Sequence, residues 1–60
     1  MKFISINAEN ETMLVNTASI LFLEHKKDRT VIHLVNGSLI YTAESIDELG
    51  KRLAKLSDKF

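Results

Sequence analysis

Short runs rich in apolar and β-branched residues, separated by polar breaks, fill the first 43 residues of the chain. Runs of this length, bounded by Asn, Asp, Ser and Gly, are typical of β-strands. The chain contains no proline that would interrupt them. The pattern therefore predicts five strands, at residues 2–7, 12–16, 20–25, 30–35 and 38–43.

The period of the apolar pattern changes after these strands. Ser45 and Glu48 match the capping box that begins many helices, with Ser45 as the N-cap. Apolar residues then follow at spacings of three, four and three: Ile46, Leu49, Leu53 and Leu56. This spacing places them on one stripe of an amphipathic helix, so we predict a helix over residues 45–57.

The pair Asn36-Gly37 lies between two of the predicted strands. A two-residue turn of type I′ requires positive φ at both turn positions, and Asn-Gly adopts this conformation more readily than most pairs. Such a turn would pair Ile32 with Tyr41 across the hairpin. The preceding hairpin, centred on Lys27-Asp28, would fix the third strand against the fourth.

These two hairpins sort the side chains of the last three strands onto two faces. We assign the more uniformly apolar face to the helix; it comprises Leu21, Leu23, Ile32, Leu34, Leu39, Tyr41 and Ala43. The opposite face, where Phe22 would pair with His33, carries Ile20, Phe22, Val31, Val35 and Ile40, with Glu24, His33, Ser38 and Thr42 among them. One helix cannot cover both faces, and soluble monomers rarely expose a large apolar patch. We therefore expect an interface made of Ile20, Phe22, Val31, His33, Val35 and Ile40.

Taken together, the elements predict one α+β domain over residues 1–60. We expect an antiparallel sheet of four to five strands, at about residues 2–43, with the C-terminal helix packed on one face. A chain of 60 residues buries only a small core. Small domains gain stability from disulfides, metals or association, and this chain has no cysteine. We therefore expect the protein to gain stability by self-association into a dimer or a larger homo-oligomer.

Eight basic and eight acidic residues give a formal net charge of zero. This balance argues against a dedicated nucleic-acid binder, which usually carries a positive excess. The alternative reading relies on a small basic loop, in which Lys26, Lys27 and Arg29 would contact phosphates despite the intervening Asp28. No stretch approaches the length of a membrane span, so we expect no membrane insertion and a cytoplasmic location.

No residue cluster carries recognisable catalytic chemistry. Glu44, Asp47 and Glu48 are explained by the favourable place of acids near a helix N-terminus, and Ser45 by capping. The sequence shows neither metal-ligand spacing nor a glycine-rich phosphate loop. We therefore expect no enzyme activity and no cofactor. For His33 two readings stay open: an interface histidine with a satisfied hydrogen bond, or a pH-sensitive element of that interface.

The order of these features resembles that of the FlbD-like family of small bacterial flagellar proteins. The resemblance rests on Leu14, Asn16, Ile20, Thr30, Val31, Ile32, Leu34, Asn36, Gly37, Glu44, Ser45, Asp47 and Leu49. It implies an accessory role in flagellar motor performance or swarming, and it supplies no catalytic residues. A second resemblance is to the first half of LytTR-type DNA-binding domains, whose DNA-contacting segment would begin where the sequence reaches Phe60.

These observations favour a non-enzymatic interaction module that associates with itself through its sheet and that acts as an accessory or regulatory protein. The alternative is a small nucleic-acid-binding regulator of the LytTR-like kind. The sequence does not identify a protein partner.

Overall fold

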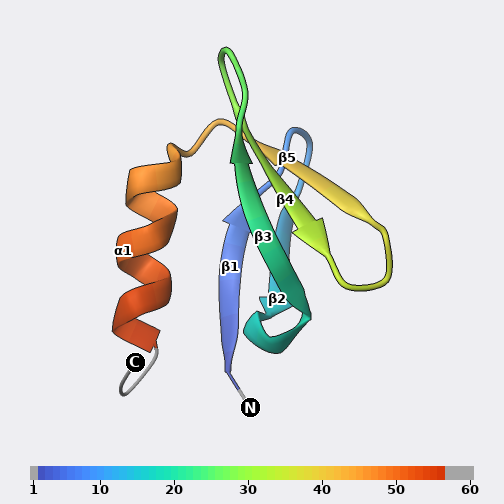
Figure 1. The fold of residues 1–60 in the computed structure, drawn as a ribbon, viewed down its shortest axis with the longest axis vertical. Helices are drawn as coiled ribbons and strands as arrows, with labels where there is room; N and C mark the ends of the chain where they lie inside the picture. The colour runs from blue at the N-terminus through green and yellow to red at the C-terminus, as the bar shows by residue number, and fades with distance from the viewer. Residues whose placement is uncertain (1, 57–60) are drawn as a thin grey trace.

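The computed structural model describes residues 2–56 (Figure 1). Its elements, in chain order, are β1 (Phe3–Asn7), β2 (Thr12–Asn16), the 3-10 helix η1 (Thr17–Ser19), β3 (Ile20–His25), β4 (Thr30–Leu34), β5 (Leu39–Thr42) and α1 (Ile46–Leu56). Every strand and the helix lie where the sequence predicts them, with ends that differ by at most a residue or two. The predicted last residue of the helix, Ser57, lies outside the described residues.

The strands form two antiparallel sheets, where the sequence analysis expected one. β1 pairs with β2, and β3, β4 and β5 form a second sheet in that order. The chain passes between the sheets through η1, whose N-cap Asn16 accepts a hydrogen bond from Ala18 N–H at 3.0 Å. A single bridge between Ala8 and Thr42 joins the sheets. The α+β class, the five strands and the C-terminal helix are therefore confirmed, and the single sheet is wrong.

The core lies between the two sheets and α1. Its buried members are Ile4, Ile6, Val15, Ile32, Ile40 and Leu49, and partly buried Met13, Ile20, Leu23, Leu34, Leu53 and Leu56 pack against them. Figure 1 shows α1 beside β1 and β3, the two strands that it contacts most. Three of the four predicted stripe residues thus reach the core. The helix begins as predicted, because Glu48 N–H donates to Ser45 Oγ at 3.1 Å.

The pairing of β3 with β4 follows the predicted register over most of its length. Phe22 lies opposite His33, as expected, but a bulge between Ile20 and Phe22 then shifts the register. The extra residue, Leu21, is exposed, whereas the sequence placed it against the helix. Ile20 is paired with Leu34 and packs against the core.

The β4–β5 hairpin differs from the prediction by one residue. Gly37 has a φ of +91°, and no other described residue has positive φ, so a type I′ turn is excluded at Asn36. Leu34 N–H donates to the Ser38 carbonyl and Gly37 N–H donates to the Leu34 carbonyl, both at 2.9 Å. These bonds define a three-residue turn with glycine in the left-handed position, the next most common hairpin geometry.

This turn moves every side chain of β5 to the opposite face, because strand side chains alternate with a period of two. Ile40 now lies opposite Ile32 in the core, and Thr42 lies opposite Thr30; all four side chains are buried. Leu39 and Tyr41, which the sequence assigned to the helix side, face away from the core.

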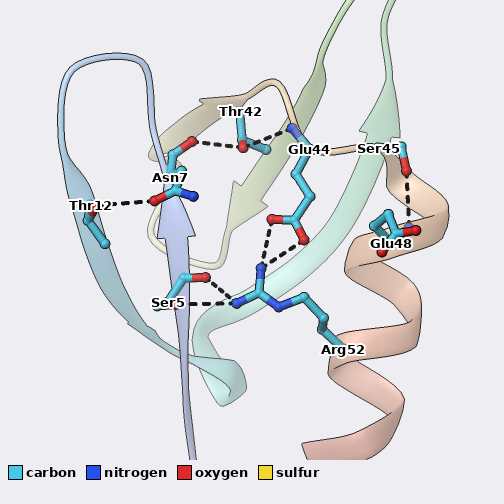
Figure 2. A network of polar contacts seen from close by, with 8 residues as sticks. All are labelled: Ser5, Asn7, Thr12, Thr42, Glu44, Ser45, Glu48 and Arg52. Carbon is cyan, nitrogen blue, oxygen red and sulfur yellow. Dashed lines mark hydrogen bonds and ion pairs between the residues drawn. The ribbon is translucent and has the colours of Figure 1, made fainter.

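A polar network fastens α1 to β1 (Figure 2). Arg52 Nη1 donates to both carboxylate oxygens of Glu44, at 2.7 and 2.8 Å. Arg52 Nη2 donates to the carbonyl of Ser5 at 2.5 Å and to its hydroxyl at 3.3 Å. Beside it, the buried Thr42 hydroxyl donates to the Asn7 carbonyl at 2.8 Å. The network fixes the β5–α1 connection against the first strand.

Candidate interaction surface

We call the side of β3, β4 and β5 that faces away from the core the outer face. The strand register arranges its side chains in two cross-strand rows. Phe22, His33 and Leu39 form the first row, and Glu24, Val31 and Tyr41 form the second. Phe22 is 49% exposed, Leu39 45% and Tyr41 39%. The protein thus presents an open sheet surface with large exposed apolar side chains on β3 and β5, the two outer strands of the sheet.

The first row is held by a ring contact and a short chain of polar contacts. The rings of Phe22 and His33 are stacked, with centroids 4.1 Å apart and planes 15° from parallel. His33 Nε2 lies 2.9 Å from Glu24 Oε1, and Lys26 Nζ lies 3.3 Å from Glu24 Oε2. The hydrogen bond from His33, followed by that from Lys26, lowers the pKa of Glu24 below its usual value of 4.5. His33 therefore has the satisfied hydrogen bond that one of its two readings requires.

In the second row, the neighbouring side chains shield the central strand β4 from solvent. Val31 lies between Glu24 and Tyr41 and is buried, although it is not part of the core cluster. The guanidinium of Arg29 lies over the Tyr41 ring, 5.3 Å from its centroid, a cation–π geometry. This end of the outer face is consequently amphipathic, with a cation resting on an aromatic ring.

Of the six residues predicted to form the interface, only some lie on the outer face in the structure. Phe22, Val31 and His33 lie on the outer face, as expected. Val35 is exposed in the β4–β5 turn. The assignment of Ile20 and Ile40 to this face is wrong, because the bulge in β3 and the shifted register of β5 turn both toward the core.

Leu39 and Tyr41 take the places on the outer face that the sequence analysis gave to other residues. The signal that could have found them is the glycine at position 37. A turn with one left-handed residue, in place of the two of a type I′ turn, exchanges the two faces of β5.

The basic loop offers less free positive charge than its sequence suggests. Lys26 pairs with Glu24, and Arg29 Nη1 lies 3.2 Å from Glu9 Oε2 and its Nε 3.5 Å from Asp28 Oδ1. Two of the three cations proposed for phosphate contact therefore have carboxylate partners in the same chain. Such partners reduce the attraction that a phosphate would experience at this loop.

The acidic residues and the serine at the start of α1 have structural partners. Glu44 is bound by Arg52, and Ser45 caps the helix. Within residues 2–56, no three His, Cys, Asp or Glu side chains are grouped closely enough to hold a metal ion. The one α-helix in this part of the chain is too short and too polar to cross a membrane.

Comparison with known proteins gives no match to a family model, and no significant match among curated proteins or solved structures.

Proposed function

We propose that this protein is a non-enzymatic interaction module that associates with a second copy of itself through the outer face. The observation that carries the proposal is the exposure of Phe22 on β3 and of Leu39 and Tyr41 on β5, all on the outer face of the same sheet. No described element packs over them, since α1 lies on the other side of the sheet with the core. The resemblance to FlbD-like proteins supports an accessory or regulatory role for such an assembly.

The charges around the outer face favour a second copy over a strongly charged partner. Glu24 and Lys26 lie together at one edge, so the face presents both signs. In a two-fold dimer the same patch meets itself, and a patch with both signs can place a cation of one copy beside an anion of the other. The net charge of zero adds no general repulsion between copies.

The size of the outer face sets the strength that we expect. Three strands of about five residues cover an area of about 14 by 17 Å, given ordinary strand spacing and rise. This footprint is smaller than the roughly 800 Å² per partner of a standard stable interface. We therefore expect a reversible dimer with a dissociation constant in the range of about 10 μM to 1 mM, rather than an obligate one.

Sedimentation equilibrium over this concentration range tests the proposal with two matched variants. Phe22→Lys places a charge in the first row of the outer face, whereas Leu14→Lys places one on the exposed side of β2, outside that face. We expect the wild type and Leu14→Lys to form dimers and Phe22→Lys to remain monomeric, with unchanged circular dichroism in all three. A wild type that stays monomeric at about 1 mM contradicts the proposal, as does a Phe22→Lys variant that dimerises like the wild type.

A further inference from the structure

A groove separates β2 from β5 beyond the single bridge between Ala8 and Thr42 that joins the two sheets. We call it the seam. Its first half, of about 400 Å³, is lined by residues 8–11 and 38–41 together with Met13 and Leu34. Its second half, of about 270 Å³, is lined by residues 13–16 and 34–36 together with Ser19 and Ile40. Both halves are lined by Met13, Leu34 and Ile40, so they form one continuous groove, and these three apolar residues make up its floor.

Both walls of the seam are edge strands. β2 is an edge of the two-stranded sheet, and β5 is an edge of the three-stranded sheet, at the right in Figure 1. The bridge between Ala8 and Thr42 closes one end of the gap. Along the remaining length, neither strand has a neighbouring strand among the described residues. An edge strand presents backbone N–H and C=O groups that an added strand can bind.

The register shows which backbone groups point into the seam. Leu34 N–H donates to the Ser38 carbonyl, and bonded and non-bonded pairs alternate along an antiparallel ladder. Leu39 and Tyr41 therefore direct their backbone groups away from β4. Thr17 N–H donates to the Lys2 carbonyl, so the same alternation directs the backbone groups of Leu14 away from β1.

The charge of the seam is one-sided. Among the described residues that line it, the charged side chains are Glu9 and Glu11, both at the end near the β1–β2 turn. Arg29 already pairs with Glu9. Glu11 is exposed, and no described residue forms an ion pair with it. A ligand that places a positive charge at this end would complement the groove.

We propose that the seam binds an extended peptide segment, with alternate apolar side chains on the Met13–Leu34–Ile40 floor and a basic residue beside Glu11. The peptide adds a strand to the free edges of β2 and β5, so main-chain hydrogen bonds supply the affinity and the floor and the carboxylate supply the specificity. The seam borders the outer face along β5, where Leu39 and Tyr41 belong to both, but its floor and its free backbone edges lie outside the rows through which we propose self-association.

Fluorescence anisotropy with labelled synthetic peptides tests the proposal. The probe is a peptide of about seven residues, long enough to span β2, that alternates valine with threonine and has lysine at both ends. A second peptide has glutamate at both ends, and a third is the lysine peptide with alternate backbone amides N-methylated. We expect the wild type to bind the lysine peptide with a sub-millimolar dissociation constant and the glutamate peptide about tenfold more weakly. N-methylation should abolish binding.

Two charge reversals serve as a matched pair. Glu11→Lys should reverse the preference between the lysine and glutamate peptides, whereas Glu48→Lys, at an exposed position on α1, should leave it unchanged. The Phe22→Lys variant should bind the peptide like the wild type, which separates this test from that of the outer face. Equal binding of the N-methylated peptide, or a preference that Glu11→Lys does not alter, overturns the proposal. So does a loss of self-association in Leu14→Lys but not in Phe22→Lys, because a second copy would then occupy the seam.

Discussion

Replacing Arg52 with methionine should destabilise the protein more than any other change to an exposed or half-exposed charge. The methionine keeps much of the aliphatic length but removes the guanidinium that joins α1 to Glu44 and to Ser5 (Figure 2). Two kinds of loss follow. The fork of charged hydrogen bonds disappears, and the Glu44 carboxylate, which is mostly shielded from water, loses its partner.

The magnitude follows from the exposure of the pair. Hydrogen bonds to charged groups contribute about 1.5–3 kcal/mol when well buried, whereas exposed ion pairs contribute about 0.2–1 kcal/mol. The side chains of Arg52 and Glu44 are 35% and 20% exposed, which places this pair between those limits. We expect Arg52→Met to lower the free energy of unfolding by about 1.5 kcal/mol, which for a domain of this size corresponds to about 10 °C in Tm.

Urea denaturation of four proteins tests this estimate: the wild type, Arg52→Met, Glu44→Gln and the double variant. The double-mutant cycle should give a coupling energy of about 1 kcal/mol. Arg52→Lys should recover less than half of the loss, because an ammonium cannot reproduce the planar fork. Lys51→Met, at the adjacent exposed position, is the control and should change stability by no more than about 0.5 kcal/mol. A coupling energy of zero, or equal effects of Arg52→Met and Lys51→Met, would refute the assigned role of Arg52.

Substitution of the two glycines by alanine should have opposite effects on thermal unfolding. Gly37→Ala should lower the free energy of unfolding by about 1 kcal/mol, because the φ of this residue is +91°. Gly50→Ala should raise it by up to about 1 kcal/mol, because alanine favours the helical conformation of α1. Neither added Cβ meets an atom within 4 Å, so equal effects would mean that backbone conformation does not decide them. Ser45→Ala should lower the free energy of unfolding by about 1 kcal/mol through loss of the bond to Glu48 N–H, and an unchanged denaturation midpoint would contradict this. The lowered pKa of Glu24 means that the folded state binds fewer protons, so this group stabilises fully above about pH 4.5 and less as pH falls through the lowered value. Denaturation at about pH 6 and about pH 3 should therefore show a smaller loss in Glu24→Gln than in the wild type; equal losses would remove Glu24 from the explanation.

The sequence predicted the elements well because each is encoded locally. The boundaries of β2 and β3 follow from alternation and from polar breaks, and the start of α1 follows from Ser45 and Glu48. The pairing of Phe22 with His33 was also predictable, because a charged loop of the expected length joins their strands. These features depend on interactions among residues that are close in the chain.

The features that were missed depend on contacts between distant residues. Asn36-Gly37 is compatible with a two-residue or a three-residue turn, and the choice is made by burial of Ile40 opposite Ile32 and by the bond between Thr42 and Asn7. Nothing near Leu21 marks a bulge. The division into two sheets likewise depends on how β1 and β2 fold over the other sheet. Ile20 and Ile40 were therefore assigned to the outer face incorrectly, and Leu39 and Tyr41 were missed, although the apolar character of this face was predicted.

The closeness of β1 and α1 also affects when the protein can fold. Arg52 and Ser5 are separated by 47 positions, and Ile4 and Ile6 share the core with Leu49. A chain emerges from the ribosome with its N-terminus first. The apolar side of β1 therefore has no helix to cover it until α1 has been synthesised. The core around β1 therefore cannot be completed before α1 has been synthesised.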